Sequence, residues 1–367
     1  MIVLQVRYRR IIRDEDIVCM VPRRRNARST SRVIGTVDQR LHRQTENMHD
    51  IHIPERPLKR RISDLTLAVL ACAAISSTAH GAGAPAAPSP EIHIEDVERF
   101  YEIYDAANGR PTAEQLQRDY IDAGSEGLHT LARLRNVTGA RIAETLAKNP
   151  QIYSKARRCM AVLPRVKERV QVALGALARL NPDAQFPSVT VAVSRGKPAG
   201  IGYPDTGIQI GLEAVCAADF LNPDVEDRFV HLISHEYVHV QQAPALAATE
   251  DLTVLERSLL EGIAEMMSEL ISGLAGQAHF PALTQGREKQ IEMAFIADQD
   301  KTDLSAWLDN STMEKPGDLG YWIGHRIAKS YYQHATDKRQ AERDILQMTD
   351  AKAFLAKSGW YPGIMLQ

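Results

Sequence analysis

The sequence lacks internal repeats, is poor in cysteine and carries almost no net charge. Without a repeat period, a solenoid or a propeller is not expected. Only 4 of the 367 residues are cysteine, which is too few for a fold held together mainly by disulfides. The charged fraction of 25% and the hydrophobic fraction of 44% fit one large or two modest globular domains.

The N-terminal part also lacks an apolar run long enough to span a bilayer comfortably. Its apolar run, Leu65 to Ile75, follows a cluster of basic residues and precedes small residues typical of a cleavage site. We therefore interpret 48–84 as a signal peptide and 85–91 as a flexible linker. Residues 1–47 are rich in arginine and show no helix or strand period, which favours an unstructured upstream extension over a nucleic-acid-binding arm.

The signal peptide predicts a periplasmic or secreted protein. A retained membrane anchor is one alternative, and lipidation at Cys72, which would tether the protein in the envelope, is another. In the exported part Cys159 and Cys216 remain. An oxidising compartment would permit them to pair, but the sequence leaves two free buried thiols equally open.

Export would also remove much of the positive charge. Residues 82–367 hold 29 Lys and Arg against 38 Asp and Glu, a net charge of about −9. A strongly negative chain is repelled by phosphate backbones, so nucleic acid is not an expected partner.

The motif that carries chemistry is His-Glu-x-x-His at 235–239, inside the apolar stretch 229–240. On a helix, His235 and His239 lie on one face one turn apart and can reach one metal ion. Glu236 can then act on a water as general base. Burying two histidines and a glutamate is costly unless something pairs them, and a zinc ion would do so.

A third ligand is expected from a second apolar helix around 258–267. Catalytic zinc takes three protein ligands, and two histidines with one glutamate are a recurrent set. Glu261 follows His239 by 22 positions, which leaves room for a turn and an antiparallel return. Gly262 would let the two helices approach closely. Glu265, one turn further, either contacts a metal ligand without binding the metal itself or points outward as a surface charge.

The remaining periodicity predicts a mainly α protein with a small β-sheet, an α+β fold, in a single domain over 92–367. The alternating, β-branched pattern predicts strands at 188–193 and 207–212, with a loop rich in Gly and Pro between them. Helices are expected around 97–104, ended by 109–111, and over 112–123, 125–134, 138–148, 151–180 (kinked or divided at Pro164), 285–299, 301–309 and 317–332.

The last of these helices carries Gly320 and Gly324 one turn apart, a smooth face for close packing against another helix. Tyr321 and His325 share the adjacent turn spacing. Either side chain could donate a hydrogen bond to the oxyanion that forms when water attacks a carbonyl. A core tyrosine and a surface histidine are the alternatives.

Taken together, His235–His239, Glu261–Ala264 and Gly320–Gly324 resemble the exported zinc-dependent proteases related to the gliding-motility B lipoproteins. The resemblance also takes in Phe100–Asp105 and Phe186–Pro187 and covers about 95–335. It implies a zincin-like, gluzincin-type metallopeptidase core with the second-helix glutamate as third zinc ligand. The resemblance does not identify a substrate.

The expected function is hydrolysis of a peptide bond in a peptide or protein substrate. Zinc would activate a water, and Glu236 would take its proton and pass it to the leaving amine. The alternative is a non-catalytic envelope scaffold with a structural or vestigial metal site. An intact Glu236 counts against that alternative, because a structural site needs no base.

Overall fold

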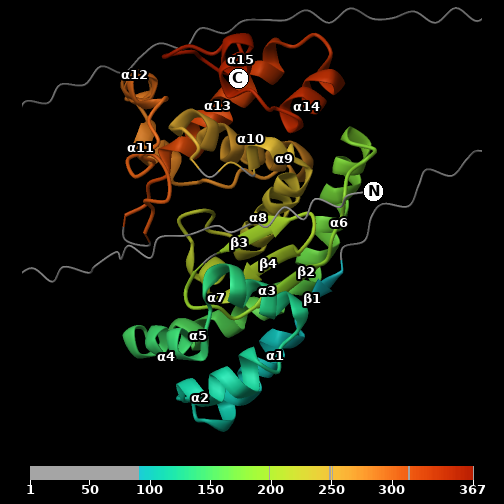
Figure 1. The fold of residues 1–367 in the computed structure, drawn as a ribbon, viewed down its shortest axis with the longest axis vertical. Helices are drawn as coiled ribbons and strands as arrows, with labels where there is room; N and C mark the ends of the chain where they lie inside the picture. The colour runs from blue at the N-terminus through green and yellow to red at the C-terminus, as the bar shows by residue number, and fades with distance from the viewer. Residues whose placement is uncertain (1–90, 198, 248, 250, 313–314, 367) are drawn as a thin grey trace, which may run out of the picture. The chain divides into compact units, whose positions relative to one another are not determined.

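The computed structural model describes residues 91–366, except 198, 248, 250 and 313–314 (Figure 1). The predicted upstream extension, the signal peptide and nearly all of the linker lie outside these residues. Mostly helical, the described part has one small mixed sheet, so the prediction of an α+β fold is confirmed. None of the helices in this part is long and apolar enough to cross a membrane.

The sheet has the strand order β1-β2-β4-β3. Strands β1 (Ile92–His93), β2 (Val189–Ala192) and β4 (Gly207–Gly211) run parallel, and β3 (Gly200–Tyr203) pairs antiparallel with β4 at the edge. The two strands predicted from β-branched alternation are confirmed as β2 and β4. The sequence did not predict β1, which is only two residues long, or β3, whose two glycines are rare in strands.

Between β1 and β2 the chain forms a series of helices, some of which pack against the sheet. Strands β2 and β4 pack against α3, and β2 also contacts α1. The predicted helix over 151–180 is divided, and Pro164 lies in the first turn of the long segment, where its missing N–H costs nothing. These helices are α1 (Glu95–Ala106), α2 (Ala113–Gln115), the π-helix η1 (Leu116–Ile121), α3 (Glu126–Arg135), α4 (Gly139–Lys148), α5 (Ile152–Ala156), the 3-10 helix η2 (Arg157–Val162) and α6 (Leu163–Leu180).

Helix α8 (Val225–Gln241) lies between the sheet and α10 (Val254–Ser272). It contacts β3 and β4 on one side and α10 on the other, while α6 contacts both helices (Figure 1). The other helices of this part are α7 (Leu212–Ala217), α9 (Pro244–Ala247), α11 (Phe280–Thr284), α12 (Glu288–Asp298), α13 (Leu319–His334), α14 (Lys338–Leu346) and α15 (Ala351–Lys357).

Glycines bring α13 unusually close to α10. A Cβ on Gly262 would lie 2.1 Å from the carbonyl carbon of Gly324, and a Cβ on Gly324 would lie 1.8 Å from Ser258 O. The smooth face predicted for Gly320 and Gly324 therefore packs on α10. The expectation that Gly262 faces the other metal helix is wrong, because the backbone that fills its space belongs to α13.

The helix predicted at 301–309 does not form. Only a single turn closes there, with Trp307 N and Leu308 N donating to Leu304 O. Before it, the Asp303 carboxylate accepts from Ser305 N, and after it Asp309 takes a positive φ of 57°. Local side-chain hydrogen bonding and the left-handed residue together stop propagation of a helix.

Cys159 and Cys216, whose pairing the sequence left open, form a disulfide between η2 and α7. The bond closes a loop of 57 residues. On the chain-entropy relation, closing a loop of this length in the unfolded chain stabilises the fold by about 4 kcal/mol.

Candidate metal centre

Helix α8 presents both motif histidines toward α10. Asp224 caps its N-terminus by accepting from Asp227 N, and apolar neighbours bury the middle of the helix. His235 and His239 lie one turn apart with their Nε2 atoms 3.0 Å from each other. Both therefore point at the same place between the two helices.

Helix α10 supplies the third predicted ligand. A capping box between Thr253 and Glu256 fixes where the helix begins. Two turns on, Glu261 Oε2 lies 3.4 Å from His235 Nε2 and 3.2 Å from His239 Nε2. The structure thus brings His235, His239 and Glu261 together, as their spacing predicts.

The donor set and its dimensions fit a zinc ion. A zinc about 2.0–2.2 Å from each of three ligand atoms in a tetrahedron places those atoms about 3.3–3.6 Å apart. Of the observed separations, 3.4 Å lies within this range, and 3.0 and 3.2 Å are slightly shorter. Two neutral imidazoles and one carboxylate are also a ligand set that leaves a fourth position open.

Each ligand is oriented by a neighbour. His239 Nδ1 lies 2.8 Å from Gln242 Oε1, while the Gln242 amide donates to Leu260 O at 2.7 Å. Because an amide oxygen only accepts, His239 carries its proton on Nδ1 and directs the Nε2 lone pair at the metal position.

Arg257 orients the carboxylate ligand. Its Nη2 lies 2.7 Å from Glu261 Oε1, one helical turn away, so Oε2 alone faces the histidines. Burial by itself would raise the pKa of Glu261, but Arg257 and the two histidines outweigh it and hold that pKa well below its ordinary value. Glu261 is therefore ionised at neutral pH, as a metal ligand must be.

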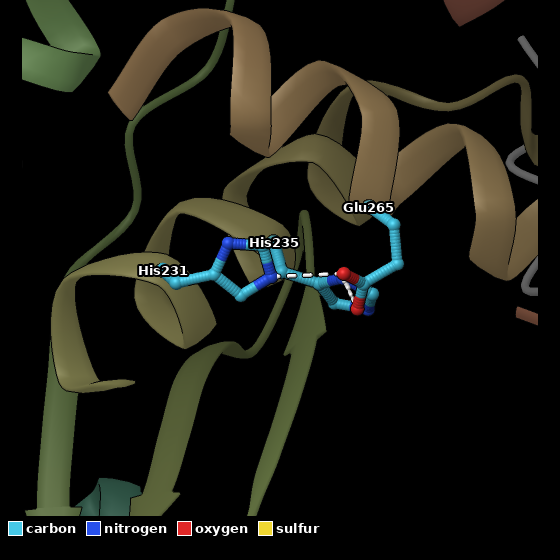
Figure 2. A group of neighbouring side chains, drawn as sticks. All are labelled: His231, His235 and Glu265. Carbon is cyan, nitrogen blue, oxygen red and sulfur yellow. Dashed lines mark hydrogen bonds and ion pairs between the residues drawn. The ribbon is translucent and has the colours of Figure 1, made fainter. Parts of the chain in front are cut away.

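Behind His235 lies a second buried group, His231 and Glu265 (Figure 2). Glu265 Oε1 is 3.1 Å from His235 Nδ1, an ion-pair distance without hydrogen-bond geometry, and Glu265 Oε2 is 3.0 Å from His231 Nε2. Glu265 therefore faces inward, which resolves the alternative that the sequence left open. His231 was not predicted, although its four-residue spacing from His235 is itself a signal.

The charges of this group act on His235. Burial lowers the pKa of His235, but the carboxylates of Glu261 and Glu265 outweigh it and raise that pKa to about 10. Below that pH the ring is protonated on both nitrogens, so a metal must displace a proton to bind Nε2.

Glu236 is buried beside the ligands and against β3. It is 5% exposed, and burial raises its pKa although His239 and His235 pull the pKa down. A Cβ on Gly200 would lie 2.6 Å from Glu236 Oε1, and one on Gly202 would lie 2.7 Å from Glu236 O. The two glycines of β3 thus make room for Glu236.

The structure separates the two candidates on α13. The ring of Tyr321 stacks on His235, with centroids 6.2 Å apart and planes at 18°. Burial first, and then the charge of Glu261, raises the pKa of Tyr321 well above its ordinary value, so its hydroxyl stays protonated. His325 instead contacts Glu269, with His325 Nε2 2.6 Å from Glu269 Oε2.

A family model described as "Predicted Zn-dependent protease (DUF2268)" matches residues 190–355, a range that holds most of β2, all of β3 and β4, and both α8 and α10. No curated protein and no solved structure matches the chain. The chain is thus similar to a family named for zinc-dependent proteolysis, and its buried His and Glu groups are candidate ligands for that metal.

Zinc uptake is expected to release protons. Because the pKa of His235 is raised to about 10, the metal-free ring holds an extra proton at pH 7–8, and zinc must displace it. The zinc association constant should therefore rise about tenfold per pH unit in this range from His235 alone. Calorimetry in two buffers of different ionisation enthalpy measures the proton release.

In the same titration Glu261→Ala should bind zinc far more weakly, because one of three ligands is lost. Zinc binding without proton release, or with Glu261→Ala unaffected, would contradict this ligand assignment.

Proposed function

We propose that this protein is an exported zinc-dependent peptidase with a zincin-like core of the gluzincin type, related to the gliding-motility B lipoproteins. One observation carries the proposal: His235, His239 and Glu261 converge to within 3.4 Å, and the buried Glu236 adjoins them without joining the ligand triangle. A purely structural zinc site has no use for an unpaired buried carboxylate, so this arrangement favours catalysis over a scaffold role.

His235 Nε2, His239 Nε2 and Glu261 Oε2 would hold the metal. When bound, zinc supplies Lewis acidity, which brings the pKa of water to about 7 and polarises a carbonyl oxygen. Arg257 pairs with Glu261 Oε1, so Glu261 would offer a metal only Oε2.

Glu236 is the proposed general base. Its burial and raised pKa bring its proton affinity closer to that of the water that it must deprotonate. After taking that proton it would pass it to the leaving amine, which departs as a neutral group. The contact with Gly200 holds the carboxylate in one place for both transfers.

Strand β3 supports an extended peptide as substrate. It is the edge strand of the sheet, and among the described residues no further strand pairs with it. It packs against Glu236, and its edge away from β4 could hydrogen-bond a peptide as an added strand. Main-chain recognition of this kind accepts many sequences.

Tyr321 is the proposed donor to the oxyanion, in preference to His325. Its ring adjoins His235, and its raised pKa keeps the hydroxyl protonated as a donor. The His325 ring contacts the Glu269 carboxylate, so we propose no role for His325 in the reaction.

Export, to the periplasm or the outside, remains part of the proposal. A disulfide between Cys159 and Cys216 fits an oxidising compartment. The net charge of about −9 over 82–367 disfavours nucleic acid as a partner. Envelope anchoring would require lipidation at Cys72.

Glu236→Gln is expected to retain zinc and lose at least about 10²-fold in peptide cleavage, because an amide cannot accept the proton. Cleavage of a peptide pool, read by mass spectrometry, measures the loss, and a chelator should abolish the wild-type cleavage. Chelator-insensitive cleavage, or an unchanged rate in Glu236→Gln, would refute the mechanism. A zinc-loaded protein that cleaves nothing in a broad pool would favour the scaffold alternative.

Gly200→Ala should disturb the base and spare the metal. Its new methyl group would lie 2.6 Å from Glu236 Oε1, so the carboxylate must move. We expect zinc content to stay at the wild-type level while kcat falls by about 10²-fold, the typical cost of misplacing a reacting group by about 1 Å. Unchanged kcat would show that Glu236 is not the positioned base.

A further inference from the structure

His231 is a buried histidine that the proposed mechanism does not use. It lies one turn before His235 on α8 and is 5% exposed. Its Nδ1 is 3.0 Å from Leu274 O, and its Nε2 is 3.0 Å from Glu265 Oε2. A carbonyl and a carboxylate oxygen are both acceptors, so each ring nitrogen of His231 faces an acceptor.

Glu265 is therefore held from two elements. Gln277 Nε2 donates to Glu265 Oε1 at 3.0 Å, and His231 Nε2 donates to Glu265 Oε2. The remaining neighbour of the carboxylate is His235, whose Nδ1 lies 3.1 Å from Oε1 (Figure 2). Because His231 and Gln277 fix both oxygens, the Glu265 carboxylate can contact His235 in only one orientation.

We propose that His231 is a positioning residue for the metal centre, which acts through Glu265 to hold His235 with its Nε2 directed at the metal position. A carboxylate beside Nδ1 keeps the remaining ring proton on that nitrogen when Nε2 binds metal. The proposal rests on the proposed metal centre but not on peptide hydrolysis. It can therefore be tested by metal binding alone.

The same residue links the metal centre to the segment that follows α10. Leu274 and Gln277 from this segment bond to His231 and Glu265 respectively. A Cβ on Gly276 would lie 1.8 Å from His231 Nε2, so the backbone of the segment covers the ring directly. The position of this segment and the orientation of His235 therefore depend on each other.

A second metal ion between His231, His235 and Glu265 is the competing interpretation, since these three residues also converge. Such an ion would need a lone pair on His235 Nδ1 while Nε2 serves the first site. A neutral imidazole has only one lone pair, so both sites could fill together only if His235 lost both ring protons. The positioning role requires no such deprotonation.

Three substitutions at His231 separate its two hydrogen bonds. Gln carries an amide nitrogen near the place of Nε2 and can still donate to Glu265, whereas Asn carries one near the place of Nδ1 and can donate only to Leu274. Phe keeps the ring and removes both donors. His325→Phe is the matched control, because the His325 imidazole pairs with the carboxylate of Glu269, which is not one of the three proposed ligands.

The experiment measures zinc affinity of the purified protein by competition with a chromophoric chelator. We expect His231→Phe and His231→Asn to bind zinc about 10- to 100-fold more weakly, the usual cost of losing a residue that orients a metal ligand. His231→Gln should stay within about 3-fold of wild type on the same scale, and His325→Phe should not change. Absorption of the cobalt-substituted protein should shift in the Phe and Asn variants, which altered stability alone would not cause.

A double-mutant cycle tests the route through Glu265. In the Glu265→Gln background, His231→Phe should weaken zinc binding little further, because the two residues act as one unit. Additive effects, equal affinities for the Gln and Phe variants, or an unchanged Phe variant would overturn the proposal. Two zinc ions per wild-type chain and one per His231→Phe chain would establish the second metal site instead. A wild-type protein that binds no metal would refute the proposed function as well.

Discussion

Burial of charge between α8 and α10 is the constraint on which the rest of this structure depends. Three glutamates, Glu236, Glu261 and Glu265, are each at most 5% exposed there, together with His231 and His235. Isolated charges cannot be buried at this depth, so each carboxylate needs a compensating cation or proton. Arg257 forms an ion pair with Glu261, and the His231 ring contacts the Glu265 carboxylate. No ion pair of this kind reaches Glu236 from the described residues, and burial raises its pKa.

The packing around the site keeps these charged side chains buried. Glycines let backbone approach backbone on two sides: Gly200 and Gly202 bring β3 onto α8, and Gly262 with Gly324 brings α13 onto α10. Close backbone packing excludes water from the cluster, which strengthens each electrostatic interaction inside it. It also places the edge strand β3 against Glu236 and the ring of Tyr321 against His235.

The sequence was sufficient for features governed by local spacing. The four-residue step from His235 to His239 and the apolar helix around Glu261 predicted residues that the structure does bring together. β-Branched alternation predicted β2 and β4. Features that depend on tertiary contact were missed: β3 is glycine-rich and becomes a strand by pairing with β4, and His231 gains its partners only when α10 and the following segment fold over it.

The central claim is that His235, His239 and Glu261 bind one zinc ion, and X-ray absorption at the zinc edge tests it most directly. For the protein loaded with one equivalent of zinc, we expect only nitrogen and oxygen scatterers at about 2.0–2.2 Å, with the outer-shell pattern of two imidazoles. In Glu261→Ala, the spectrum of any zinc that still binds should no longer fit this set of ligands. Sulfur scatterers, a single imidazole, or a spectrum unchanged in Glu261→Ala would contradict the account.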